Sequence, residues 1–216
     1  MTHQEQTIET KASERPCVKE EEIARGNWLS LNKITYTDPH GTERTWESVK
    51  RTTAKSGTDA VCVIAILKRM LKYDCLVLVK QYRPPMNCYT LEFPAGLIDE
   101  SETAETCGVR ELKEETGYTG IMKHQSPATC LDPGIGGTTC HIMTAEIDGD
   151  LDCNIHPKPS LEETEFIEVV CVPMEELLQR LNDYSKQGVI VNSMVYSYAI
   201  AMEQTKNIKN KTTCSI

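Results

Sequence analysis

Glutamates gather in one short segment of the chain in a pattern that suits a divalent cation. Glu111 and Glu115 are four positions apart, and Glu114 is three positions from Glu111. On a helix these spacings place all three carboxylates on one face, where they repel one another and only Lys113 interrupts them. Taken alone, such a run would indicate a solvated acidic face. Carboxylate oxygens are also the ligands that a hard divalent cation needs, with room left for water and a phosphate.

The residues around these glutamates predict the helix that would carry them. Apolar side chains recur at near-helical spacing across residues 103–116, and Gly117 follows as a helix stop. Arg110 lies inside this stretch and can brace the carboxylates by charge-assisted hydrogen bonds. Gly96 precedes it, where the chain must turn tightly onto the helix. We therefore expect loop, helix and loop.

Strands are predicted on both sides of this helix. Apolar or alternating runs indicate strands at 61–69, 75–83, 89–93, 139–145 and 166–172, and amphipathic runs indicate helices at 174–181 and 193–202. Nearer the N-terminus, the alternating segments 27–37 and 44–53 are separated by the turn signal Asp38-Pro39-His40-Gly41, which predicts a β-hairpin. The expected fold class is therefore an α/β or α+β layered domain preceded by a small β unit.

Composition excludes several classes of function. The chain has 216 residues, and 23 basic against 32 acidic residues give a formal net charge of −9. This balance argues against binding to nucleic-acid phosphates and against a basic membrane-surface protein. No apolar run reaches the length of a membrane span, and the N-terminal residues lack the apolar core of a signal peptide. We expect no nucleic-acid partner and no membrane partner.

The cysteines indicate the cellular compartment. Ten cysteines are scattered along the chain without a C-x-x-C pair or a cluster at zinc-binding spacing. Their positions inside apolar runs favour buried, reduced thiols, which are typical of an intracellular protein. We expect a cytoplasmic location, with the nucleus as a second compartment.

One stretch of the chain, residues 96–118, carries more than the clustered glutamates. It matches the pattern G-x5-E-x7-R-E-U-x-E-E-x-G-U, in which U is a bulky apolar residue. The specified positions are filled by Gly96, Glu102, Arg110, Glu111, Leu112, Glu114, Glu115, Gly117 and Tyr118. On this motif the sequence resembles the Nudix hydrolases, which cleave a nucleoside diphosphate linked to another moiety. The resemblance implies an α/β/α sandwich in which loop, helix and loop present carboxylates to magnesium.

The resemblance extends beyond this motif. Segments 45–53, 80–86, 91–99, 130–134 and 165–169 look like those of the eukaryotic ADP-sugar pyrophosphatases, also called ADP-ribose diphosphatases, and they occur in the same order. The resemblance implies Mg²⁺-dependent hydrolysis of ADP-ribose and other ADP-sugars to AMP and a sugar phosphate. The expected partner is therefore a small nucleotide-sugar substrate.

The metal ligands follow from the same resemblance. It assigns Mg²⁺, with Mn²⁺ as a substitute, to Glu111, Glu115 and the main-chain carbonyl of Ala95, and it makes Glu114 a further ligand or a neighbour of the ligands. The physical reason is general, because a pyrophosphate brings negative charge into an already acidic site and bound cations must reverse the local sign. Such ions also polarise phosphoryl oxygens and lower the pKa of an attacking water.

Further residues are assigned to catalysis and to substrate contacts by the resemblance. Glu165 matches the general base, although the other glutamates of the run 162–165 leave that choice open by a few residues. Arg83 matches a contact to a phosphate or to the terminal ribose, and the prolines that follow it restrict its flank. Leu97 matches a main-chain substrate contact, and Asp132 matches a contact to the sugar side of the substrate.

The two tryptophans, Trp28 and Trp46, both lie in the predicted hairpin. A small β unit by default uses such residues as its own core. The resemblance instead implies a homodimer with shared active sites, in which one indole from each subunit sandwiches the adenine, while Glu47 and Arg51 reach the base and the phosphates. On a regular strand Trp46 and Arg51 face opposite sides. A bulge, a strand end or contacts to different parts of the substrate would reconcile this.

These observations together predict the domain organisation. Residues 1–20 are expected as a disordered lead-in and residues 21–57 as an N-terminal β unit for dimerisation and base binding. Residues 58–205 would form the Nudix hydrolase domain, and residues 206–216 a polar tail.

Two alternatives to the ADP-sugar function are also compatible with the sequence. The motif handles only the pyrophosphate, so the substrate could instead be 8-oxo-dGDP, a GDP-sugar or a dinucleoside polyphosphate. A non-catalytic nucleotide-binding regulator ranks lower, because such proteins usually lack one or more of the motif's carboxylates and this chain keeps all four.

Overall fold

The computed structural model describes residues 18–52 and 57–213, and the chain folds into two compact units. The first, here called the N-terminal unit, comprises residues 18–52 together with Cys130–Thr138. The second, here called the main unit, comprises Gly57–Thr129 and continues from Thr139. Most of the lead-in expected at residues 1–20 lies outside the described residues.

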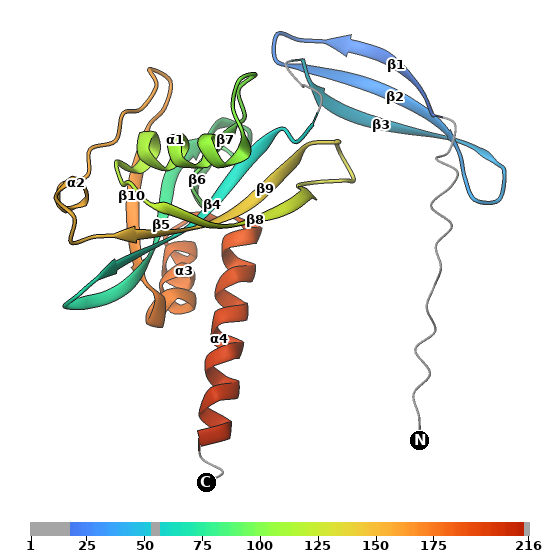
Figure 1. Ribbon diagram of the computed structural model, residues 1–216. Helices are drawn as coiled ribbons and strands as arrows, with labels where there is room; N and C mark the ends of the chain where they lie inside the picture. Colours follow the sequence, from blue (N-terminus) through green and yellow to red (C-terminus); the bar gives the residue numbers. More distant parts are fainter. Residues whose placement is uncertain (1–17, 53–56, 214–216) are drawn as a thin grey trace, which may run out of the picture. The chain divides into compact units, whose positions relative to one another are not determined.

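The N-terminal unit is built on a three-stranded antiparallel sheet in the order β1-β2-β3 (Figure 1). Its strands are β1 (Val18–Arg25), β2 (Leu29–Thr37) and β3 (Glu43–Arg51). The predicted hairpin is β2 and β3, and Asp38 Oδ1 closes its turn by accepting from the N–H groups of His40 and Thr42, both at 2.9 Å. Sequence patterning missed β1, because its run of glutamates hides the alternation of a strand.

The main unit contains an eight-stranded sheet in the order β11-β6-β5-β4-β9-β8, with β10 paired to β5 and β7 paired to β4. The strands are β4 (Ala60–Arg69), β5 (Lys72–Arg83), β6 (Cys88–Glu92), β7 (Ala95–Leu97), β8 (Ile121–Cys130), β9 (Thr139–Asp148), β10 (Ile167–Pro173) and β11 (Ile190–Val191). The α-helices are α1 (Ala104–Thr116), α2 (Asp152–Ile155), α3 (Leu177–Lys186) and α4 (Ser193–Thr213).

Helices cover both faces of this sheet. Figure 1 shows α1 on one face and α3 with α4 on the other. Strand β5 reads as a continuous apolar run because both of its faces are buried: Leu76 and Leu78 pack with Leu181 of α3, whereas Val77 packs with Leu112 of α1. The predicted α/β/α sandwich is therefore confirmed. Truncating any of these buried leucines to alanine would cost about 2–5 kcal/mol.

Local sequence signals define α1. The Thr103 hydroxyl caps its N-terminus and forms a reciprocal capping box with Thr106. Gly117 ends it at φ 77°, a left-handed conformation, and a Cβ there would lie 2.3 Å from the backbone nitrogen of Lys158. These signals match the helix predicted over residues 103–116.

Helix α4 is longer than the pattern predicted. It runs to Thr213, past the expected end at residue 202 and into the predicted polar tail. Lys206 holds this extension against the main unit by donating to the carbonyls of Met174 and Glu175, at 3.2 and 2.7 Å. Among the residues that the structure describes, no helix is long and apolar enough to cross a membrane.

Candidate active site

Glu111 and Glu115 on α1 form the centre of the site. The Ala95 N–H donates to Glu115 Oε2 at 3.0 Å, which ties the helix to β7. The Glu111 carboxylate packs directly against Gly96 of the same strand, since a Cβ added at Gly96 would be 1.8 Å from Glu111 Oε1. The two residues are only 9% and 4% exposed. The chain therefore buries two carboxylates against one strand, and a glycine makes the close approach of Glu111 sterically feasible.

Burial of this pair has an electrostatic cost. Loss of solvation, with the charges of Glu111 and Glu165 acting in the same direction, raises the pKa of Glu115 to about 8 against the opposing hydrogen bond from Ala95. Burial also raises the pKa of Glu111, although the neighbouring Arg110 opposes that shift. In the absence of a cation, a proton therefore neutralises Glu115 near neutral pH. A bound cation would stabilise the ionised form instead.

Arg110 connects most of the motif's carboxylates. Its Nε and Nη2 donate to the two oxygens of Glu102 at 2.7 and 2.9 Å, and its Nη1 donates to Glu111 at 2.8 Å and to Glu114 at 2.9 Å. A further bond runs from Nη2 to the Leu97 carbonyl at 3.1 Å. This guanidinium lowers the pKa of Glu102 to about 2. The bracing role predicted for Arg110 is thus present in the structure.

The donor set fits a hard divalent cation. No group of three His, Cys, Asp or Glu side chains in residues 18–52 and 57–213 is arranged to hold a metal ion. The expected set, however, is two carboxylates and a main-chain carbonyl. Ala95 pairs with Cys62 of β4, and the neighbouring pairs of this antiparallel ladder are hydrogen-bonded, as the bonds from Val63 N–H to the Pro94 carbonyl and from Ile98 N–H to the Asp59 carbonyl show. Hydrogen-bonded and non-hydrogen-bonded pairs alternate along such a ladder. The N–H and the carbonyl of Ala95 therefore both point away from β4.

Arg83 ends β5 beside these carboxylates. Its Nε and Nη2 donate to the two oxygens of Glu92 at 2.8 and 2.9 Å, and the Thr90 hydroxyl donates to Glu92 at 2.5 Å. The positive charge of Arg83 acts to lower the pKa of Glu115. Sequence reasoning missed Glu92 as a partner of Arg83. The sequence carried no local signal for this pair, because the pair depends on the register of β5 with β6.

Glu165 lies in the loop that precedes β10. Its Oε2 accepts from the Glu162 N–H at 2.9 Å, which closes a local turn in the acidic run. From this loop the Glu165 charge acts on both buried carboxylates and raises the pKa of Glu111 and of Glu115. Glu165 is therefore electrostatically coupled to the centre of the site.

The two tryptophans are exposed on the N-terminal unit. Trp28 is 73% and Trp46 is 50% exposed, so neither serves as a buried core for the three-stranded sheet. The Trp46 Nε1–H donates to the Gly134 carbonyl at 3.0 Å. Strands β2 and β3 pair in unbroken register, and β3 therefore has no bulge. Trp46 consequently emerges from one face of β3, and Glu47 and Arg51 emerge from the other.

Asp132 belongs to the turn that supports Trp46. Its Oδ1 accepts from the Gly134 N–H at 3.3 Å, and its carbonyl accepts from Gly136 at 3.0 Å. The predicted site residues thus fall into two sets, one in each unit. The N-terminal unit carries Trp28, Trp46, Glu47, Arg51 and Asp132, and the main unit carries Arg83, Ala95, Leu97, Glu111, Glu114, Glu115 and Glu165.

Comparisons with known proteins agree with this geometry. Residues 58–192 match the NUDIX domain family. The chain is 44% identical over 204 residues to the ADP-sugar pyrophosphatase of Mus musculus, covering 94% of each chain. It is 40% identical over 186 residues to the ADP-ribose pyrophosphatase of Saccharomyces cerevisiae, covering 84% of this chain and 80% of the yeast protein.

A solved structure supports the same fold. The crystal structure of an ADP compounds hydrolase superposes with a TM-score of 0.61 at 20% identity, covering 94% of this chain and 98% of the other. The family match spans the whole carboxylate site, from β4 through α1 to β10. The motif, the fold and the relatives therefore agree, and the chain belongs to the Nudix family of hydrolases.

Proposed function

We propose that this enzyme hydrolyses the pyrophosphate bond of ADP-ribose and other ADP-sugars, giving AMP and a sugar phosphate, and that it depends on Mg²⁺. The observation that carries the proposal is the burial of Glu111 and Glu115 against Ala95 on the helix of the Nudix motif. The names of the mouse and yeast relatives support the choice of ADP-sugars among the substrates of this family.

The metal would be held by Glu111, Glu115 and the Ala95 carbonyl, with Glu114 beside them, and Mn²⁺ would substitute for Mg²⁺. When bound, the ion would neutralise the phosphates, polarise their oxygens and acidify a water molecule. The raised pKa of Glu115 supports this assignment, because the buried carboxylate requires either a proton or a cation. Arg110 keeps Glu111 and Glu114 oriented through its two bonds.

Three groups of the main unit would act on the substrate directly. Glu165 would accept the proton of the attacking water, since it is partly exposed and coupled to the buried pair. Arg83 would bind a phosphate or the terminal ribose, with Glu92 fixing its direction. The Leu97 carbonyl already accepts from Arg110, so its main-chain contact to substrate would be made by its N–H.

The N-terminal unit would supply base recognition and dimerisation. Exposed Trp28 and Trp46 support a sandwich around the adenine, with one indole from each subunit of a homodimer. Stacking of this kind contributes about 1–3 kcal/mol per base. Because Trp46 lies opposite Glu47 and Arg51 on β3, these residues would contact different parts of the substrate. Asp132 would contact the sugar side.

Composition and cysteine state support the remaining expectations. The net charge of −9 favours neither nucleic acid nor a membrane surface as a partner. The cysteines that the structure describes are free thiols. Free thiols support a reducing compartment, and we propose the cytoplasm, with the nucleus as a second location.

The direct test incubates the protein with ADP-ribose and Mg²⁺ and measures AMP by anion-exchange chromatography. Wild-type protein should form AMP, and Glu115→Gln should lose at least about 100-fold in rate. Glu105→Gln, a control at an exposed glutamate in the first turn of α1, should retain activity. Absence of AMP, or equal rates for wild type and Glu115→Gln, would contradict the proposal.

The same assay separates the competing functions. We expect kcat/KM to be higher for ADP-ribose than for GDP-mannose or 8-oxo-dGDP, and the reverse order would change the assigned substrate. Tight ADP-ribose binding without turnover would instead indicate a nucleotide-binding regulator.

A further inference from the structure

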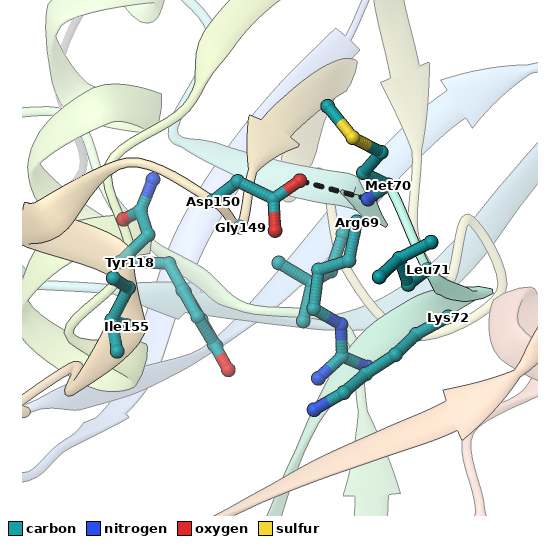
Figure 2. Close-up of a pocket in the computed structure, with 10 residues that line it drawn as sticks. Arg69, Met70, Leu71, Lys72, Tyr118, Gly149, Asp150 and Ile155 are labelled. Atoms are coloured by element: carbon teal, nitrogen blue, oxygen red, sulfur yellow. Dashed lines mark hydrogen bonds between the residues drawn. The ribbon is translucent and has the colours of Figure 1, made fainter.

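A cavity lies at the opposite end of β4 from the carboxylates, and Figure 2 shows residues that line it. Its volume is about 560 Å³, and its polar lining includes Arg69, Lys72, Tyr118 and Asp150. None of the residues assigned above to catalysis or substrate binding lines it. Arg69 ends β4 seven positions beyond Cys62, the partner of Ala95, which corresponds to about 23 Å of strand. The cavity is therefore separate from the metal site.

Two cations are placed directly opposite each other at this cavity. Arg69 of β4 and Lys72 of β5 are cross-strand partners beside the tight turn that joins the strands. Like charges in this arrangement are destabilising. The register of the two strands explains this arrangement. Between the pair Leu67–Cys75 and the pair Arg69–Lys72 the chain advances by two residues on β4 but by three residues on β5. This bulge turns Lys72 to the face of Arg69.

These cations have no anionic partner in the described part of the chain. Neither Arg69 nor Lys72 has a carboxylate within 4.0 Å there, although the protein carries an excess of acidic residues. The Arg69 Nε–H is buried and lacks a hydrogen-bond partner among the described residues, and Nη2 has only the weak acceptor Cys75 Sγ at 3.5 Å. A buried donor without an acceptor costs about 1–3 kcal/mol.

The side chains around the pair leave space for a ligand. Figure 2 shows the Arg69 guanidinium and the Lys72 amino group ending beside each other, with the Tyr118 hydroxyl directed toward the same region. Asp150 faces the cavity, and one of its oxygens accepts from the Met70 N–H at 2.8 Å. Two cations and a hydroxyl suit a phosphate, and the Asp150 carboxylate suits a ligand hydroxyl.

We propose that Arg69 and Lys72 bind the phosphate group of a small phosphomonoester in this cavity, away from the metal site. The anion relieves the repulsion across the strands and provides acceptors for the Arg69 guanidinium and the Lys72 amino group. The cavity is larger than a phosphate alone requires and lies within the usual size range for small-molecule sites. Apolar side chains, including those of Leu67 and Ile155, contact the remainder of the ligand.

Isothermal titration calorimetry tests the proposal with three probes: ribose 5-phosphate, AMP and inorganic phosphate. EDTA is present throughout, so that no divalent cation attracts phosphate to the carboxylate site and no turnover is needed. Lys72→Glu places a carboxylate opposite Arg69 at an exposed position. Lys186→Glu makes the same charge change at another exposed lysine, at the end of α3, and serves as the matched control. Circular dichroism verifies that each variant is folded.

Wild type and Lys186→Glu should bind at least one of the two phosphomonoesters with equal affinity. Lys72→Glu should bind it at least tenfold more weakly, equivalent to about 1.4 kcal/mol. Equal affinity of Lys72→Glu and wild type would overturn the proposal. So would binding of inorganic phosphate alone, or no binding of any probe to wild type at 10 mM. None of these outcomes depends on whether the protein hydrolyses ADP-ribose.

Discussion

Replacing Glu115 with glutamine is expected to stabilise the metal-free protein while removing its activity. Glutamine has nearly the same shape, and its amide oxygen can accept the Ala95 N–H that now binds Glu115 Oε2. The substitution removes a carboxylate whose pKa burial raises from 4.5 to about 8. A residue kept for catalysis at a cost in stability would show this combination.

The size of the effect follows from the two pKa values of Glu115. Because the folded state holds a proton that the unfolded state releases, wild-type stability falls as the pH rises from about 4.5 to about 8 and then levels off. Linkage gives a destabilisation of about 1 kcal/mol at pH 5 and about 5 kcal/mol at pH 9, the second figure being an upper bound. Glu115→Gln lacks this titration.

Urea unfolding in EDTA at pH 5 and pH 9 measures the difference. Circular dichroism at 222 nm is the suitable signal, because the α-helices lie in the main unit, whereas Trp28 and Trp46 both lie in the N-terminal unit. Glu105→Gln, at an exposed position in the first turn of α1, is the control and should shift little with pH. If the free energies of unfolding of wild type and Glu115→Gln differ equally at both pH values, burial does not raise this pKa.

Two further predictions concern the geometry of the site. Gly96→Ala should lower kcat about 100-fold, because the added methyl group displaces Glu111. Gly137→Ala is the control and should leave kcat unchanged, because a Cβ there meets no atom within 4 Å. Equal kcat values for the two variants would refute the steric argument. Glu92→Gln should raise the KM for ADP-ribose about tenfold with a smaller change in kcat, because Arg83 loses its charged partner. An unchanged KM would show that this ion pair does not position Arg83 for substrate.

The carboxylate helix was predictable because its signals are local. A capping threonine, a terminal glycine and the four-residue spacing of Glu111 and Glu115 specify α1 and one of its faces without reference to the rest of the fold. The strands of the main unit were predictable for a related reason. Because β4 and β5 are buried on both faces, their sequences are continuous apolar runs, which are typical of central strands in a sheet covered on both sides.

The features that the sequence did not reveal depend on pairing between distant segments. Strand β1 forms only because it pairs with β2, and its own residues are mostly charged. The partnership of Arg83 with Glu92 requires the register of β5 with β6. The face shared by Arg69 and Lys72 depends on a bulge, and one residue of register decides the side on which a side chain emerges.

Binding of Mn²⁺, followed by electron paramagnetic resonance of the free ion, tests most directly whether the acidic face of α1 holds a divalent cation. Wild type and Glu105→Gln should bind the ion equally, and Glu115→Gln should bind it at least tenfold more weakly, about 1.4 kcal/mol. The account would be contradicted if wild type left millimolar Mn²⁺ free in solution, or if Glu115→Gln bound the ion as tightly as wild type.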